Sequence, residues 1–389
     1  MIAVIETVTG SLSHEMFNAG MIWQIRKVYP EDEITYFCEK EQAEYVKKIL
    51  DTQGCRGVTY ETMNRIYLEF SRQEIAENKQ EYRNIFRKCW KARFVVILTL
   101  SAVNSGLVKN IIRRFDNLRF GVCLHGEVEM ILPQNKYKLN RRVGGIKALK
   151  EYKMEHLKNR YFKDNLNEMA ALPNCRVILY SDAYKRYRDD IEDALFDNIS
   201  VLNLPYVFTY NKCMPEKGKV FRIGIMPSSA AAEDRNCIKI IEYLDSRKDK
   251  ILYPYRFLIF NYHIGTYKNV GYITKHGRKR KDIEDFMRGC DWMLIPYDIR
   301  KYVLSSSGVM FDSIEAERPF FALDSNSFGK AIEAGCGIWE SSIEALGERI
   351  IEQINSKNEG YAEWFQHVRR YKMLVEKENL ERIERIFRK

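Results

Sequence analysis

The chain has 389 residues, of which 46% are hydrophobic and 30% charged, with a formal net charge of +10. This length suits two domains with separate cores, and no run approaches the ~20 apolar residues that cross a bilayer. The start lacks the basic region of a signal peptide, so we expect a cytoplasmic protein. The nine cysteines form no Cys-x-x-Cys pair, which disfavours a zinc cluster or disulfide framework, while the positive charge suits anionic partners.

Short apolar runs, separated by charged segments with helical spacing, fill the first half of the chain. They are rich in β-branched and aromatic residues, which predicts the strands of a parallel sheet covered by helices. These predicted strands span residues 2–5, 34–38, 94–100, 120–124 and 177–180.

The same pattern restarts after Asn203-Leu-Pro205. We therefore expect the α/β class, with two Rossmann-like domains facing across a cleft at the carboxyl ends of their strands. Breaks at Pro205, Pro215 and Lys217-Gly-Lys219 place the boundary after residue 205. The second series has strands at 220–226, 255–260, 291–295 and 320–323, helices over 238–244 and 282–287, and a last helical segment at 361–389.

Polar residues follow two predicted strands of the first domain. The loop Thr7 to Glu15 contains Gly10, Ser13 and His14, which we expect to point into the cleft and contact a ligand there; alternatively, Ser13 caps the following helix. The strand ending at Leu124 is followed by His125 and Glu127. A histidine and a carboxylate at a strand end can each take a proton from a hydroxyl, or can serve as structural hydrogen-bonding groups.

Basic residues concentrate between Lys136 and Lys163, interleaved with apolar and aromatic ones. This composition is typical of a segment that meets an anionic lipid surface, and equally of a solvated helix face. The residues that we expect to face a membrane are Arg141, Arg142, Lys147 and Lys150.

The most informative stretch runs from Asp291 to Leu323. An apolar run ends at Pro296, a polar turn opens an apolar-periodic segment, and Pro319 precedes a second apolar run, which predicts strand, loop, helix and strand. A helix N-terminus attracts phosphate through its unpaired amide groups and dipole, although Ser and Gly are also ordinary caps. The residues of the turn that would approach a phosphate or diphosphate are Ser305, Ser306, Ser307 and Gly308.

This stretch resembles the donor half of GT-B glycosyltransferases, specifically the glycosyltransferase-4-like donor domain. The resemblance implies an acceptor-side domain at residues 1–205, a nucleotide-sugar donor domain at 206–360, and a helix at 361–389 that returns to the first domain. It also implies that His125 lies at the reaction centre. The residues that it implies around the donor are Arg235, Lys239, Pro296, Tyr297, Tyr302, the serines of the turn, Gly308 and Asp312.

One position departs from the family pattern. Many retaining members carry two glutamates eight positions apart, the first touching the sugar and the second the ribose. Asp312 stands at the second position and can still accept ribose hydroxyls, but Leu304 stands at the first and has no polar group to contact the sugar.

The resemblance implies a hexosyltransferase that moves sugar from a uridine or guanosine diphosphate donor to a hydroxyl of a glycan or lipid-linked acceptor, as in polysaccharide biosynthesis. The sequence has no Asp-x-Asp, no G-x-G-x-x-G after the first strand and no P-loop lysine pattern, so we expect no metal and no cofactor besides the donor. A nucleotide-sugar epimerase of the same fold and a non-catalytic partner of another glycosyltransferase remain alternatives. We expect a glycosyltransferase partner or homo-oligomers, a peripheral position on the inner, anionic face of a membrane, and no nucleic acid.

Overall fold

The computed structural model describes most of the chain. The described residues are 1–63, 65–67, 69–133, 146–210, 218–226, 231–274, 280–297, 303–324, 328–357 and 359–388, with the backbone alone at 146–152 and 231–234. They divide into two compact units, Met1–Val207 with Glu376–Lys389, and Phe208–Val375. Among the described residues, no helix combines the length and the apolar character that crossing a membrane requires.

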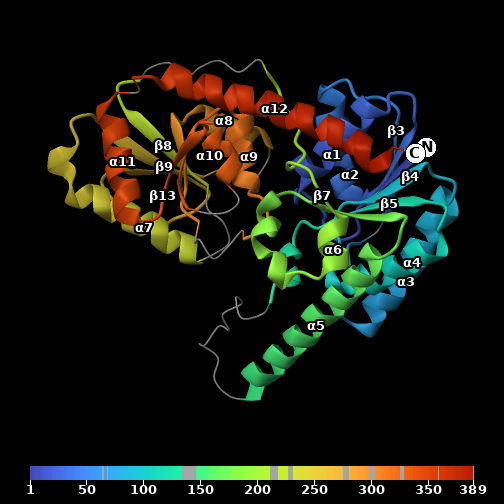
Figure 1. Cartoon of the computed structure of the whole chain (residues 1–389). Coiled ribbons are helices and arrows are strands. Elements are labelled where there is room, and N and C mark those ends of the chain that lie inside the picture. Colours follow the sequence, from blue (N-terminus) through green and yellow to red (C-terminus); the bar gives the residue numbers. More distant parts are fainter. Residues whose placement is uncertain are drawn as a thin grey trace. The chain divides into compact units, whose positions relative to one another are not determined.

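Unit 1 contains a parallel sheet of seven strands in the order β3-β2-β1-β4-β5-β6-β7 (Figure 1). The strands are β1 (Ile2–Ile5), β2 (Ile34–Glu39), β3 (Val58–Met63), β4 (Phe94–Ile97), β5 (Arg119–Cys123), β6 (Cys175–Leu179) and β7 (Ile199–Val201). The helices are α1 (Glu15–Val28), α2 (Lys40–Thr52), α3 (Arg72–Cys89), α4 (Ala102–Arg114), α5 (Ile146–Ala170) and α6 (Asp193–Asn198), with 3-10 turns at Val128–Ile131 and Asp182–Asp190.

Unit 2 contains a parallel sheet of six strands in the order β10-β9-β8-β11-β12-β13. The strands are β8 (Phe221–Ile225), β9 (Tyr255–Phe260), β10 (Val270–Ile273), β11 (Trp292–Ile295), β12 (Phe320–Leu323) and β13 (Gly337–Glu340). The helices are α7 (Ala231–Ser246), α8 (Arg280–Arg288), α9 (Gly308–Glu315), α10 (Gly329–Glu333), α11 (Ile343–Asn355) and α12 (Tyr361–Phe387), with a 3-10 turn at Lys248–Lys250.

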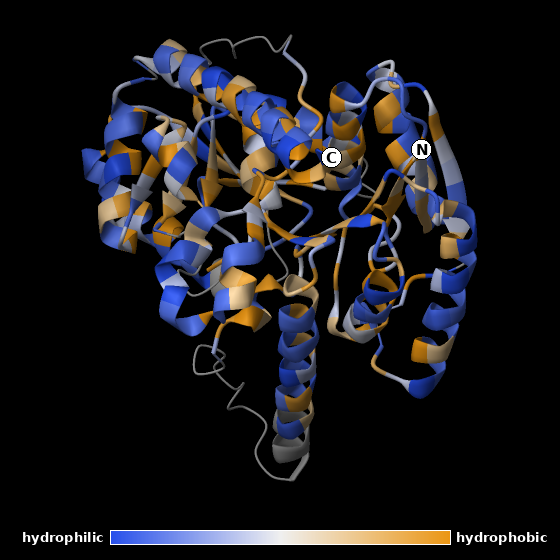
Figure 2. Ribbon diagram, turned by 45° about the vertical axis from the view of Figure 1, so that its right-hand side comes forward, coloured by the Kyte–Doolittle hydropathy of each residue, from blue (hydrophilic) through white to orange (hydrophobic). Residues whose placement is uncertain are grey.

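The central strands of both sheets are buried on both faces. All four residues of β1, β4, β11 and β12 are buried, which explains their continuous apolar runs. Hydrophobic residues gather on these inner strands while the outer faces of the helices are mostly hydrophilic (Figure 2). In unit 2, Trp292 stacks on Phe321 with ring centroids 4.3 Å apart. The prediction of two Rossmann-like α/β domains is confirmed.

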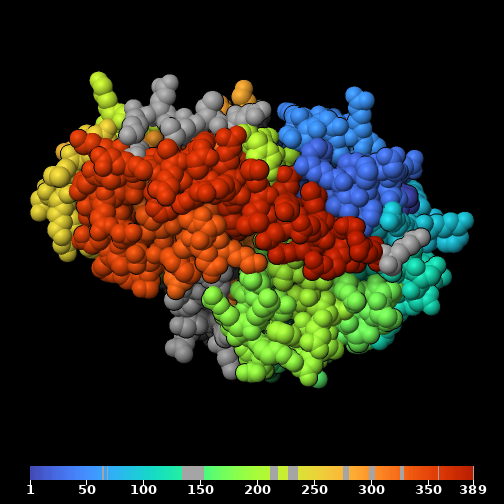
Figure 3. All heavy atoms as spheres, turned by 45° about the horizontal axis from the view of Figure 1, so that its top comes forward, coloured from blue at the N-terminus to red at the C-terminus, as the bar shows by residue number. Residues whose placement is uncertain are grey.

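Helix α12 belongs to both units, since its residues up to Val375 fall in unit 2 and those from Glu376 on in unit 1. One side of α12 is exposed at the surface (Figure 3), while the other side holds buried residues such as Val368, Asn379 and Phe387. Within unit 1, Phe387 stacks on Phe94 at 4.1 Å between ring centroids. A Cβ atom at Gly121 would lie 2.6 Å from the Phe387 ring, so glycine in β5 lets the end of α12 pack directly on the sheet.

Candidate functional site

In unit 2, the chain direction across the sheet reverses between β8 and β11. From β8 the chain continues to β9 and β10 on one side, and from β11 to β12 and β13 on the other. The two central strands are neighbours, with Ile223 opposite Trp292. Open parallel sheets bind ligands at such a switch point, outside the carboxyl ends of the strands. Helices α7 and α9 follow these two strands, so both helix N-termini lie at the switch point.

The N-terminus of α9 is capped by Ser307, whose Oγ accepts a hydrogen bond of 3.0 Å from the backbone N–H of Met310. The same hydroxyl lies 3.1 Å from the hydroxyl of Tyr297, and both side chains are buried. Ser307 therefore acts as the ordinary cap that the sequence also allowed. Gly308 is exposed, and no atom lies within 4 Å of the position where its Cβ would stand. The helix start is thus open at Gly308.

Asp312 lies about one helical turn beyond Gly308, and its carboxylate forms an ion pair with Arg280 at the start of α8. Arg280 also lies 3.2 Å from the carboxylate of Glu284. The guanidinium of Arg280 holds the Asp312 carboxylate in one orientation. Sequence reasoning missed Arg280, because it lies within the basic run 278–281 and only the fold distinguishes it from its neighbours.

The other predicted donor residues have different surroundings. The carbonyl of Pro296 accepts a hydrogen bond of 3.1 Å from the side-chain amide of Asn236, which joins α7 to the end of β11. Arg235 and Lys239 are exposed on α7, Ser305 is half-buried and Ser306 is buried. Leu304 is 1% exposed, so its side chain packs inside unit 2. Tyr302 lies outside the described residues.

In unit 1, the corresponding switch point lies between β1 and β4. Glu6, directly after β1, is fully buried and accepts hydrogen bonds from Val8 N at 2.7 Å, Thr9 N at 2.9 Å and Thr99 Oγ1 at 2.7 Å. Burial raises the pKa of this carboxyl despite these hydrogen bonds. The carboxyl group fixes the loop that contains Gly10, Ser13 and His14.

A second set of hydrogen bonds continues from this loop into the helix layer. Thr7 Oγ1 lies 3.2 Å from the hydroxyl of Tyr82, and the side-chain amide of Asn104 donates to both hydroxyls at 3.3 Å. Sequence reasoning missed this network and Glu6. The available signal was a glutamate and a threonine directly after a fully apolar strand, where two polar side chains become buried together.

His14 and His125 come from different loops and lie side by side in unit 1, with ring centroids 4.2 Å apart. His125 stacks on Phe17 at 4.6 Å and meets the edge of Tyr180 at 5.8 Å. Burial lowers the pKa of His14 to about 4. Burial and, secondarily, the charge of His14 lower the pKa of His125 well below its usual value. Both imidazoles are therefore neutral at pH 7, and the Nδ1 atom of each has no hydrogen-bond partner among the described residues.

Two other predicted residues of unit 1 have structural contacts. The carboxylate of Glu127 accepts a hydrogen bond from the backbone N–H of Ala102, at the start of α4, and pairs with Lys158 at 3.0 Å. These contacts favour His125 over Glu127 as the proton acceptor. The alternative in which Ser13 caps α1 is wrong, because His14 occupies the N-cap with φ 63° and makes no side-chain cap bond. Gly10 instead accepts a hydrogen bond of 3.0 Å from Ser13 N.

The depressed histidine pKa values predict an acid-sensitive fold. Between pH 6.5 and about 4, the unfolded chain binds protons at His14 while the native chain does not, so the free energy of unfolding falls as the pH falls through this window. A difference of 2.5 pKa units corresponds to at most roughly 3 to 4 kcal/mol of unfolding free energy. Urea denaturation at pH 7.5, 5.5 and 4.5 measures the loss, and His14→Asn should reduce it. If His14→Asn lost as much unfolding free energy at low pH as the wild type, the acid sensitivity would not come from His14.

The basic segment is described only in part. Arg141 and Arg142 lie outside the described residues, and Lys147 and Lys150 lie in α5 where the structure describes the backbone alone. Further along α5, three hydrophobic side chains share one exposed face. They are Met154, Leu157 and Tyr161, which are 63%, 60% and 41% exposed.

Comparison with known proteins finds likeness in structure. No family model matches the sequence, and no curated protein matches it. A glycosyltransferase from Rickettsia africae is similar in structure, with a TM-score of 0.62, 14% identity, and coverage of 100% of this chain and 99% of that one. HepE from Anabaena, in complex with UDP and glucose, has a TM-score of 0.61 at 12% identity over 99% of this chain and 100% of that one.

A third similar structure is WaaG, a glycosyltransferase involved in lipopolysaccharide biosynthesis, with a TM-score of 0.56, 12% identity, and coverage of 98% of this chain and 99% of that one. At these identities, the likenesses establish the fold and leave the reaction to be argued from the site.

Proposed function

We propose, from the premise that this chain has the GT-B fold, that it is a glycosyltransferase that moves a hexose from a nucleotide diphosphate sugar, with UDP as the first candidate, to a hydroxyl of a glycan or lipid-linked acceptor. The observation that carries the proposal is the switch point of unit 2, where α9 starts openly at Gly308 and the Asp312–Arg280 pair follows one turn later. Backbone N–H groups and the helix dipole attract the diphosphate, and the held carboxylate accepts ribose hydroxyls.

Charge on the departing diphosphate needs a cation or helix termini to stabilise it. Arg235 and Lys239 lie on α7, whose start is tied to the end of β11 through Asn236 and Pro296. We propose that these cations and the two helix N-termini take this role, without a metal ion. In unit 1, the neutral His125 is the proposed acceptor of the proton from the attacking hydroxyl.

The first expected result concerns donor binding. UDP or a UDP-hexose should raise the melting temperature without added metal, because a ligand at a hundred times its Kd stabilises a fold by roughly 2.7 kcal/mol. Gly308→Val should abolish most of this shift, since the branched side chain fills the space in which the diphosphate would approach the backbone. The surroundings of Gly308 are open, so the unliganded fold should tolerate the change.

Gly308→Ala is the matched control, because it adds one methyl group and should retain part of the shift. Asp312→Ala should weaken nucleotide binding by about 1.5 to 3 kcal/mol through lost hydrogen bonds to ribose. If calorimetry measures wild-type nucleotide affinity in both Gly308→Val and Asp312→Ala, the donor does not bind at the start of α9.

Two alternative functions predict different products from the donor. An epimerase of the same fold would convert the nucleotide sugar without an acceptor. A non-catalytic partner of another glycosyltransferase would leave the donor unchanged, and the buried Leu304 at the sugar-contacting position favours this reading. Incubation with donor alone and with donor plus acceptor, followed by chromatography of the nucleotides and sugars, separates the three.

We also propose that the protein works on the cytoplasmic face of a membrane, with α5 against anionic lipid. The exposed face of Met154, Leu157 and Tyr161 can enter the headgroup layer. This part of α5 projects from unit 1 (Figure 1) and carries both hydrophilic and hydrophobic residues (Figure 2).

Sedimentation with lipid vesicles tests whether α5 binds anionic lipid. Changing Arg141, Arg142, Lys147 and Lys150 to Gln should abolish sedimentation with anionic vesicles, because each basic residue near the surface contributes about 1 kcal/mol. Met154→Ser with Leu157→Ser should weaken it at unchanged charge, and activity on a soluble acceptor should persist in both. The exposed Lys47 and Lys48 on α2, changed to Gln, serve as the control pair. Undiminished vesicle binding after loss of the four basic residues would refute this docking.

A further inference from the structure

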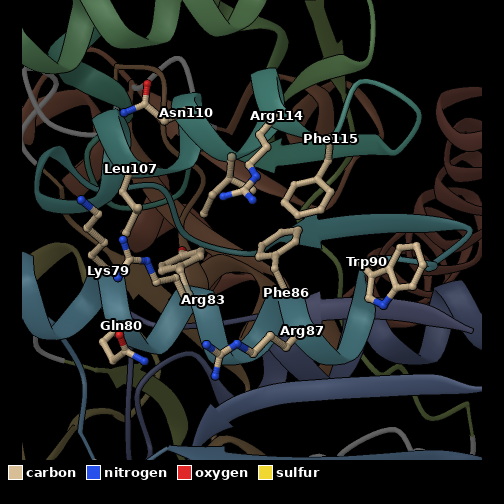
Figure 4. A pocket seen from close by; sticks show the side chains of 12 residues that line it. Lys79, Gln80, Arg83, Phe86, Arg87, Trp90, Leu107, Asn110, Arg114 and Phe115 are labelled. Carbon is tan, nitrogen blue, oxygen red and sulfur yellow. The ribbon is translucent and has the colours of Figure 1, made fainter.

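Unit 1 contains a pocket of about 710 Å³ between α3 and α4. Its lining runs from Lys79 to Trp90 on one side and from Leu107 to Phe115 on the other, with side chains from both helices facing the space (Figure 4). Both helices run from the carboxyl ends of the strands toward their amino ends. The pocket therefore extends along the middle and later parts of the helices, and Tyr82 in its lining is hydrogen-bonded to Thr7, at the start of the loop that holds His14.

The walls of this pocket are basic. Lys79, Arg83 and Arg87 recur every fourth residue along α3, which places them about 6 Å apart along the helix axis. Arg114 faces them from α4. All four are exposed, and none has an ion-pair partner among the described residues. The lining contains no carboxylate, so the charge of the pocket is uncompensated from within.

The floor is aromatic. Phe86 and Phe115 stack with ring centroids 5.2 Å apart. Trp90 lies at one end of the pocket and is 50% exposed, which is unusual for so large an apolar ring. Cations beside aromatic rings favour an extended ligand that has negative charges along its length and apolar faces between them.

We propose that this groove binds an anionic oligosaccharide, a sugar chain that bears carboxylate or phosphate groups along its length. Successive charges would meet Lys79, Arg83, Arg87 and Arg114, and the apolar faces of the sugar rings would pack on Trp90 and Phe115. A small anion such as free phosphate would use only one of the spaced cations. The biological role of the groove rests on the proposed function: the groove would hold the part of a growing glycan acceptor that lies far from the reacting hydroxyl.

The test is a titration of the full chain with a decamer of galacturonic acid. Calorimetry and tryptophan fluorescence measure the binding. Arg83→Glu with Arg87→Glu should weaken binding at least about tenfold, because two charge-assisted contacts become repulsive. Lys47→Glu with Lys48→Glu on α2 changes the net charge equally and should alter affinity less than about twofold. Equal weakening in both double variants would mean that net charge alone attracts the sugar chain, and would overturn the proposal.

The aromatic contact has its own variants and ligands. Trp90→Ala should weaken binding at constant charge and remove most of the fluorescence change, while Trp90→Phe should retain affinity. A neutral maltodextrin of equal length should not bind. A thymidine decanucleotide that binds more tightly than the galacturonate, and loses this affinity in Arg83→Glu with Arg87→Glu, would overturn the assignment to a glycan in favour of nucleic acid.

Donor binding distinguishes failure of the groove from failure of the proposed function. Arg83→Glu with Arg87→Glu should keep the wild-type thermal shift with UDP-hexose, because these residues lie in unit 1 and the donor site in unit 2. A chain that binds galacturonate in the groove but no nucleotide sugar would retain the groove and lose the glycosyltransferase assignment. A chain that binds nucleotide sugar but no galacturonate would overturn the groove proposal and leave the glycosyltransferase assignment standing.

Discussion

His125→Ala is expected to lower kcat by about 10²- to 10⁴-fold, the range that a positioned general base contributes. His125 is held between Phe17 and His14, with its Nδ1 atom unpartnered among the described residues. Burial keeps its pKa well below the usual value, so the imidazole is unprotonated at neutral pH. Donor affinity should remain at the wild-type level, which calorimetry with UDP measures separately from turnover.

The pH profile and a second variant identify the base. Because the pKa of His125 is depressed, activity should persist well below pH 6.5, and His14→Asn should move the acidic limb to higher pH by removing the neighbouring charge. Glu127→Gln is the matched change at the alternative candidate, and should affect stability more than kcat through the contacts with Ala102 and Lys158. Loss of turnover in Glu127→Gln with normal turnover in His125→Ala would reverse the assignment.

Lys372→Met is expected to destabilise unit 2 by about 3 to 5 kcal/mol, the cost of leaving buried charges without their partner. Lys372 is 0% exposed, lies 3.2 Å from a carboxylate oxygen of Glu315 and 3.1 Å from one of Glu317, and donates to the carbonyl of Thr209. Glu315 in turn accepts a hydrogen bond of 2.7 Å from Thr209 Oγ1. Removing the ammonium leaves two buried carboxylates that repel each other.

Urea denaturation followed by tryptophan fluorescence measures this loss. Glu317→Gln should recover part of the stability when combined with Lys372→Met, because it removes one unpaired charge. Arg370→Met changes an exposed cation of the same helix and should stay within about 0.5 kcal/mol of wild type. If the Lys372→Met chain is as stable as Arg370→Met, the ion pairs of Lys372 with Glu315 and Glu317 contribute no net stability. The cluster joins the end of α9 to α12, so a weakened cluster should also loosen the proposed donor site at the start of α9.

The central strands could be predicted from the sequence, whereas four of the edge or outer strands could not. Strands such as β1 and β11 are buried on both faces, and their uninterrupted apolar runs predict them. The edge strand β3 has only Met63 buried, and β7 has no buried residue. An edge strand carries polar residues on its open side and loses the apolar signal. The strands β10 and β13 lie at the edges of the other sheet. Each has four residues, one of them a glycine, and only two of the four are buried, so each gives a short and weak apolar signal.

The sequence by itself determined the local features: the α/β alternation, the switch from strand to helix at Ser307 and Gly308, and the presence of histidines after strands. These depend on neighbouring residues, through periodicity, capping and burial. Tertiary structure alone decided which of these features meet. It brought His14 to 4.2 Å from His125, paired Asp312 with Arg280, buried Glu6 against Thr99, and placed the cations of α3 opposite Arg114. The reason is that such contacts follow from strand order in the sheet, and a periodic pattern specifies each strand without specifying its neighbour.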